Sequence, residues 1–147
     1  MGKDIGYLPG NLEEKMRPYL SPIQDNLEFL MSGDDRKMLD EYLKDGTIEI
    51  EALTFIRGRS IPRAFILIDE AQNLTAHELK TILTRVGQGT KIVLTGDVEQ
   101  IDNVYVNATT NGLTHCVERF RPHDCAGHIT LCKGERSFVA TLASEIL

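Results

Sequence analysis

Two short apolar runs, each followed directly by acidic residues, constrain the fold of this chain more than any other feature. Residues 64–68 read Ala-Phe-Ile-Leu-Ile and lead into Asp69 and Glu70, and residues 91–95 read Lys-Ile-Val-Leu-Thr and lead into a glycine and Asp97. A strand with apolar side chains on both faces is typical of the middle of a parallel sheet. We therefore predict two buried parallel strands whose carboxyl ends carry the acids.

Helical patterns alternate with these strands along the chain. Thr75 and Glu78 have the spacing of a capping box at the start of the helix that follows the first run. Two further strands are expected at 47–52, where the side chains alternate in polarity, and at 128–131. Because strands alternate with helices, we predict a single α/β domain over residues 1–147, with a parallel sheet covered by helices on both faces. With their capping residues, the expected helices cover 11–16, 21–33, 34–46, 75–86, 111–120 and 136–147.

The charge balance restricts the partners of the chain. There are 16 Lys and Arg against 22 Asp and Glu, so the net charge is −6. This balance argues against a protein that coats nucleic acid by bulk charge, although it allows a local basic site. The apolar runs are far shorter than the roughly 18 residues of a bilayer span, and no basic-then-apolar leader opens the sequence. We therefore expect a cytoplasmic protein with no membrane segment and with its three cysteines as free thiols.

The acids at the two strand ends are candidates for nucleotide chemistry. Ligands of open α/β sheets bind at the carboxyl ends of the strands, along one edge. An apolar strand followed by Asp69 and Glu70 matches the Walker B pattern. In that pattern the first carboxylate holds Mg²⁺, usually through its water shell, and the second orients the attacking water. The alternative is a strand end whose acids simply face solvent.

Segments after both strands resemble motifs of superfamily-one helicases. Residues 69–73 resemble motif II, and residues 95–100 resemble motif III, whose glutamine senses the γ-phosphate. Residues 129–137 look like motif IV, whose arginine reaches the γ-phosphate. Arginine suits that contact because it is always charged and pairs bidentately with phosphate oxygens. The resemblance therefore implies γ-phosphate sensing by Gln100 and charge stabilisation by Arg136.

Four other residues are candidates for weaker contacts. Asp97 closes the second strand beside the expected nucleotide, and Lys133 would add positive charge three residues before Arg136. A solvated strand-end lysine is the alternative for Lys133. Arg57 and Arg59 lie in a loop before the first strand, where they would grip RNA phosphates or form a solvated basic loop.

The match is closer still to one family. Similar segments occur along almost the whole chain, at 6–10, 19–27, 51–59, 69–74, 95–102, 112–114 and 133–137. In these segments the chain resembles the PhoH family. This resemblance implies a three-layer P-loop NTPase fold of the RecA-like type that binds ATP and Mg²⁺. Some members carry this domain after an RNA-cleaving PIN domain and are proposed to unwind RNA, so single-stranded RNA is an expected partner.

One expected motif does not occur in the sequence. The Walker A loop has the form G-x-x-x-x-G-K-[ST], and the Gly-Lys pair near the start, Gly2-Lys3, is followed by Asp4. In the PhoH family this loop lies upstream of the matched segment, so we interpret the chain as an N-terminally truncated, partial domain that hydrolyses ATP negligibly by itself. A sheet without its central P-loop strand has an exposed edge, which favours self-association into a homo-oligomer.

Two function classes follow from these observations. The first is an ATPase domain that couples ATP hydrolysis to RNA binding or remodelling. The second is a degenerate, non-catalytic P-loop-like module for subunit association or RNA binding. A zinc site is the weakest of the remaining interpretations, because the available ligands fit no standard spacing. These ligands are His115, Cys116, His123, Cys125, His128 and Cys132.

Overall fold

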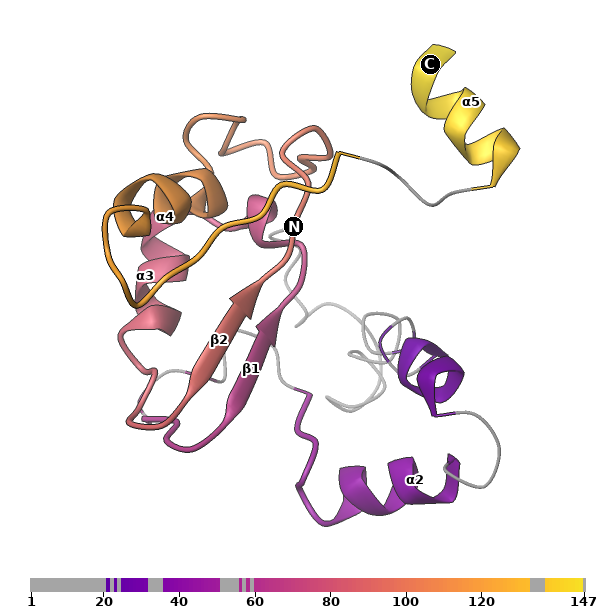
Figure 1. Ribbon diagram of the computed structural model, residues 1–147, viewed down its shortest axis with the longest axis vertical. Coiled ribbons are helices and arrows are strands. Elements are labelled where there is room, and N and C mark those ends of the chain that lie inside the picture. Colours follow the sequence, from indigo (N-terminus) through magenta and orange to yellow (C-terminus); the bar gives the residue numbers. More distant parts are fainter. Residues whose placement is uncertain are drawn as a thin grey trace, which may run out of the picture. The chain divides into compact units, whose positions relative to one another are not determined.

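The structure is a computed structural model that describes residues 21, 23, 25–31, 36–50, 56, 58, 60–132 and 137–146. The chain divides into two compact units, the first made of Met1–Ile66 and Lys80–Ile92 and the second of Leu67–Leu79 and Val93–Leu147. Residues 25–30 are also helical. The named elements, drawn in Figure 1, are α2 (Arg36–Lys44), β1 (Phe65–Ile68), the 3-10 helix η4 (Ala71–Asn73), α3 (Ala76–Leu83), β2 (Lys91–Leu94), α4 (Gly112–Phe120) and α5 (Phe138–Ile146).

The two strands predicted from the apolar runs form and pair with each other. β1 and β2 are neighbours in a two-stranded sheet (Figure 1). In the first unit the N–H of Lys91 donates to the carbonyl of Ala64 at 3.0 Å, and in the second unit the N–H of Thr95 donates to that of Ile68 at 2.9 Å. Both partners advance by four residues in the same direction, so the pair is parallel, as expected. The described chain is thus a mixed α/β structure with a small parallel sheet.

The expectation that both faces of the first strand are buried is wrong for this chain. Ile68 is 7% exposed, whereas Phe65 is 66% exposed and Leu67 is 59% exposed. Successive side chains of a strand point to opposite faces, so one face of β1 is covered and the other is open. The apolar run therefore predicts the strand correctly but overstates its burial, because burial of the second face needs a layer that the described residues do not supply.

The capping box predicted at the start of α3 is confirmed. Thr75 Oγ1 accepts a hydrogen bond from the N–H of Glu78 at 3.2 Å, and Glu78 Oε2 accepts from the N–H of Thr75 at 2.8 Å. Each side chain satisfies an N–H group that the first helical turn leaves without an intrahelical partner. This reciprocal pair sets where α3 begins, directly after the loop that carries the acids.

The start of α4 is fixed against the loop between η4 and α3. Asn111 is fully buried and caps the helix, since its side-chain oxygen accepts from the N–H of Thr114 at 2.9 Å. The next N–H, that of Gly112, donates to the carbonyl of Leu74 at 2.6 Å. A Cβ at Gly112 would lie 2.8 Å from the carbonyl oxygen of Thr75, so only glycine allows this close approach. The helix predicted here is confirmed at Gly112–Phe120.

Two predicted strands are wrong in their described parts. Residues 47–50 form bends and irregular backbone, and residues 128–131 have no regular structure. Ile129 is 82% exposed and Leu131 is 87% exposed. A period-two pattern becomes a strand only where a neighbouring backbone pairs with it, and no described segment pairs with 128–131.

The other predicted helices are confirmed in α2, α3, α5 and the helical residues 25–30, with ends that differ by a few residues. The helix expected at 11–16 lies outside the described residues. Across the part of the chain that the structure describes, no helix has both the length and the apolar character needed to cross a membrane.

Candidate functional site

The second unit brings the ends of β1 and β2 together through Asp69. Asp69 Oδ1 accepts a hydrogen bond from Thr95 Oγ1 at 2.7 Å and from the N–H of Glu70 at 3.0 Å. The N–H of Ala71 continues the contact between the two strand ends, because it donates to the carbonyl of Thr95 at 2.9 Å. Asp69 uses only Oδ1 for its two bonds, so within the described residues Oδ2 remains available to a ligand.

Glu70 has an unusual backbone conformation. Its φ of 55° and ψ of 36° lie in the left-handed region, which costs a residue with a Cβ on the order of 1–2 kcal/mol. Residues in such conformations cluster at functional sites, where surrounding contacts hold them. Here the carboxylate oxygen Oε2 accepts from Gln72 Nε2 at 2.6 Å and from Asn73 Nδ2 at 3.4 Å. The Glu70 side chain is exposed, so it can reach a ligand at this edge.

Gln72 connects Glu70 to the loop after β2. Its side chain is fully buried. Nε2 donates to the carbonyl of Gln100 at 3.0 Å in addition to Glu70, and Oε1 accepts from the N–H of Asp97 at 3.1 Å. A Cβ at Gly96 would overlap Gln72 Oε1, so the loop passes the amide at a distance that only glycine permits.

Asn73 holds the continuation of the same loop. Its Oδ1 accepts from the N–H groups of Asp102 at 2.8 Å and Asn103 at 3.2 Å, and its carbonyl accepts from Asn103 Nδ2 at 2.8 Å. Gln72 and Asn73 together therefore attach the segment from Asp97 to Asn103 to the end of β1.

Gln100 and Asp97 are in direct contact within this loop. Gln100 Nε2 donates to Asp97 Oδ2 at 2.6 Å, and Asp97 Oδ1 accepts from the N–H of Glu99 at 2.9 Å. Both Asp97 and Gln100 are exposed. Four of the expected site residues, Asp69, Glu70, Asp97 and Gln100, are thus gathered at one edge of the second unit.

The donor set fits a magnesium ion better than a transition metal. Mg²⁺ keeps several waters and takes one or two carboxylates from the protein, and Asp69 offers one carboxylate oxygen at an exposed edge. Within the described residues, no group of three or more His, Cys, Asp or Glu side chains gathers around one point. The three cysteines are free thiols, as expected.

The remaining expected site residues cannot be placed. Arg57, Arg59, Lys133 and Arg136 lie outside the described residues, so their roles stay predictions.

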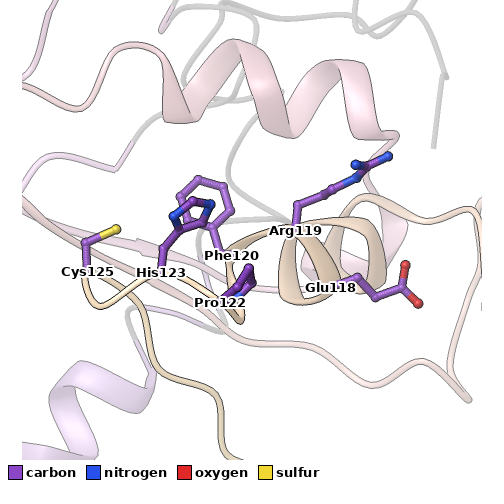
Figure 2. A pocket seen from close by; sticks show the side chains of 6 residues that line it. All are labelled: Glu118, Arg119, Phe120, Pro122, His123 and Cys125. Carbon is purple, nitrogen blue, oxygen red and sulfur yellow. The ribbon is translucent and has the colours of Figure 1, made fainter.

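A separate hollow of about 650 Å³ lies at the end of α4. The Phe120 and His123 rings meet edge to face there, with centroids 6.3 Å apart. Figure 2 shows the residues that line the hollow, Glu118, Arg119, Phe120, Pro122, His123 and Cys125.

Two groups away from the strand ends have shifted pKa values. Partial burial raises the pKa of the Cys116 thiol, which lies on α4. In the first unit, hydrogen bonds from Thr47 lower the pKa of Asp45.

Sequence reasoning missed the residues that organise the site. Gln72, Asn73 and Thr95 make most of the contacts between the two strand ends, yet none carries the charge that marks a catalytic group. The available signal was two amide side chains one alanine after the paired acids, since such residues bond well to loop backbone.

The sequence matches a known family over nearly its whole length. The family model described as PhoH-like protein matches residues 1–141. The chain is 58% identical over 148 residues to Protein PhoH2 of Bacillus subtilis (strain 168), a match that covers 100% of this chain and 34% of the relative. It is 43% identical over 146 residues to Protein PhoH2 of Mycolicibacterium smegmatis, which covers 99% of this chain and 32% of the relative.

The chain is also similar, over a shorter length, to a PhoH-like protein of Bacillus subtilis (strain 168). The two are 45% identical over 101 residues, which is 69% of this chain and 31% of that protein. The chain spans about a third of the length of the curated relatives that it matches.

Proposed function

The chain belongs to the PhoH family, whose domain is a P-loop NTPase, and we propose that it supplies the Walker B side of an ATP-hydrolysing site. The observation that supports this most is the hydrogen-bonded edge at which Asp69 and Glu70 meet Asp97 and Gln100. Acids and amides from two strand ends at one edge are the arrangement that a parallel α/β sheet offers to a nucleotide.

Each residue has a role in this proposal. Asp69 holds Mg²⁺ through its available oxygen, and the ion supplies charge neutralisation at the phosphates when bound. Glu70 accepts a hydrogen bond from the attacking water and orients it toward the γ-phosphate. Gln100 senses the γ-phosphate, and Arg136 stabilises the charge that develops there. Asp97 and Lys133 contribute to nucleotide binding beside these groups.

The contacts of Glu70 leave one of its two carboxylate oxygens available to the water. Oε2 accepts the bonds from Gln72 and Asn73, so the other carboxylate oxygen, Oε1, is left to face the water. Gln100 Nε2 uses one of its two hydrogens for Asp97, so its second hydrogen is the one donated to the γ-phosphate. Nucleotide binding is thereby linked to the conformation of the loop that Gln72 and Asn73 hold.

The wider function that we propose is ATP-driven RNA remodelling by an assembled protein. The three-layer RecA-like sheet, with helices on both faces, is the fold of the whole domain. Arg57 and Arg59 contact single-stranded RNA phosphates, whose affinity for arginine depends on salt. Homo-oligomers cover apolar surface such as the open face of β1, where Phe65 and Leu67 are exposed. The protein acts in the cytoplasm.

A second function applies if the whole protein carries no G-x-x-x-x-G-K-[ST] segment before residues 1–147. A chain without the phosphate-binding loop and its lysine lacks the groups that cradle the phosphates. Under this alternative the chain is a non-catalytic module for subunit association or RNA binding.

Measurement of ATP turnover separates the two functions. The 147-residue chain is compared with a longer protein in which the same segment follows a Walker A loop. We expect negligible turnover by the chain alone and turnover by the longer protein that Glu70→Gln abolishes. Glu118→Gln, the same chemical change on an exposed glutamate of α4, is the matched control and leaves turnover unchanged. A longer protein that turns over ATP equally well with Glu70→Gln contradicts the proposed site.

A further inference from the structure

Gln72 is the buried side chain through which the two halves of the candidate site are connected. The residue is fully buried, although glutamine is usually exposed. Its two amide hydrogens are donated to Glu70 Oε2 at 2.6 Å and to the carbonyl of Gln100 at 3.0 Å, while its oxygen accepts from the N–H of Asp97 at 3.1 Å. A single amide group therefore satisfies partners in both loops at once.

The surroundings leave this amide little freedom to move. On the side of the loop, Gly96 approaches so closely that a Cβ there would overlap Gln72 Oε1 and lie 2.9 Å from Leu113 Cδ2. On the side of β1, Glu70 is in the left-handed region, and its exposed side chain is held by hydrogen bonds to its carboxylate. The bond from Gln72 is the shortest of those contacts.

We propose that Gln72 is a positioning residue that orients the Glu70 carboxylate and couples it to the loop of residues 96–100. This inference rests on the proposed ATPase function, but Gln72 itself does not touch nucleotide or water. Movement of Asp97 or Gln100 on nucleotide binding shifts the same amide that holds Glu70. The Glu70 carboxylate is therefore in position to orient water only when the loop of residues 96–100 is in the position in which it contacts the γ-phosphate.

Two substitutions at Gln72 separate its donor and acceptor roles. Gln72→Glu keeps an oxygen that accepts from Asp97 but loses the bond to the Gln100 carbonyl, and its buried carboxyl group takes up a proton that it shares with Glu70. Gln72→Leu removes all three bonds at similar volume. In the ATPase-competent longer protein, we expect both variants to lower kcat about tenfold to a hundredfold, because small displacements of a catalytic group have effects of this size. KM for ATP changes by less than about twofold, since the phosphate contacts remain.

Asn111→Asp is the matched control. Asn111 is the other fully buried amide side chain of the described residues, and its change to a carboxylate also removes donated bonds, in this case to Asn107, Ala108 and Thr114. It does not bond to the candidate site. We expect this variant to lose thermal stability but to keep kcat per folded molecule within about twofold.

Amide hydrogen exchange tests the coupling without ATP turnover. In the 147-residue chain, Gln72→Leu should speed exchange at the Asp97 N–H at least about tenfold, because that group loses its acceptor. Gln72→Glu keeps the acceptor and leaves exchange near the wild-type rate. The N–H of Thr114, which is bonded to Asn111, serves as the reference for global opening.

Each result is decisive for one of the two proposals. An inactive longer protein refutes the ATPase function, and the exchange rates at Asp97 then decide the coupling alone. An active longer protein with unchanged kcat in Gln72→Leu refutes the positioning role. Equal exchange at Asp97 in wild type and Gln72→Leu refutes the coupling, whatever the activity.

Discussion

Replacement of Asn111 by alanine should destabilise the second unit more than any ordinary surface change. Asn111 is fully buried at the start of α4. Its oxygen accepts from the N–H of Thr114 at 2.9 Å, and its nitrogen donates to the carbonyls of Asn107 and Ala108 and to Thr114 Oγ1, each at 2.9 Å. The substitution removes the helix cap and also the hydrogen bonds that the Asn111 side chain donates.

The magnitude follows from these contacts. Loss of an N-cap side chain costs about 1 kcal/mol. The amide has two hydrogens, and two lost hydrogen bonds of about 1 kcal/mol each add about 2 kcal/mol. Asn111→Ala should therefore lower the free energy of unfolding by about 3 kcal/mol, which corresponds to a fall in Tm of about 6–12 °C for a chain of this size. Asn111→Asp keeps the cap oxygen but buries a carboxylate against the carbonyls of Asn107 and Ala108, so it should lower the free energy of unfolding at least as much as Asn111→Ala.

Urea and thermal unfolding, followed by circular dichroism, measure both values. The comparison separates the lost hydrogen bonds from the cost of a buried carboxylate, because both variants lack the amide donor. If both variants unfold within about 0.5 kcal/mol of the wild type, as exposed positions do, the contacts of Asn111 do not contribute as the structure indicates.

Three further outcomes are expected. In the ATPase-competent longer protein, Glu70→Gln should keep ATP binding and lower turnover by about a hundredfold or more, and Arg136→Ala should lower it by about a thousandfold; wild-type rates in both variants would contradict the site. Alkylation of Cys116 by iodoacetamide at pH 8 should be slower than that of Cys125 and Cys132, since burial raises its pKa and lowers the thiolate fraction; peptide mass spectrometry checks this, and equal rates would contradict it. Light scattering should show association of the chain at high concentration, and a clean monomer would count against it.

Features with local causes were predictable from the sequence. The capping box of Thr75 and Glu78 joins residues three positions apart, so its two bonds form wherever the helix forms. The two apolar runs predict β1 and β2 because their β-branched and apolar side chains favour extended backbone beside a neighbour. The position of the Asp-Glu pair was also predictable, because the pair follows the first strand directly and so lies at the edge of the sheet.

Features that depend on distant partners were not predictable in this way. Residues 128–131 have the composition of a strand but no described neighbour, so they have no regular structure. The open face of β1 has the same cause, because an apolar side chain such as Phe65 is buried only where another layer covers it. The composition of a segment shows which side chains could be buried. Pairing with a neighbouring strand and coverage by another layer decide which side chains are buried.

The amides of Gln72 and Asn73 show why a site can be located from its charges and still be incompletely understood. Gln72 and Asn73 read as polar surface residues in any pattern of polar and apolar positions, yet their partners lie 25 to 30 residues along the chain. Burial of the Gln72 amide is tolerated because donors and acceptors in the loop satisfy it. Such a network has few alternative arrangements, so a change in the loop is transmitted to Glu70 instead of being absorbed. The acids then determine which reaction the edge can support, and the amides determine when the acids are in position for it.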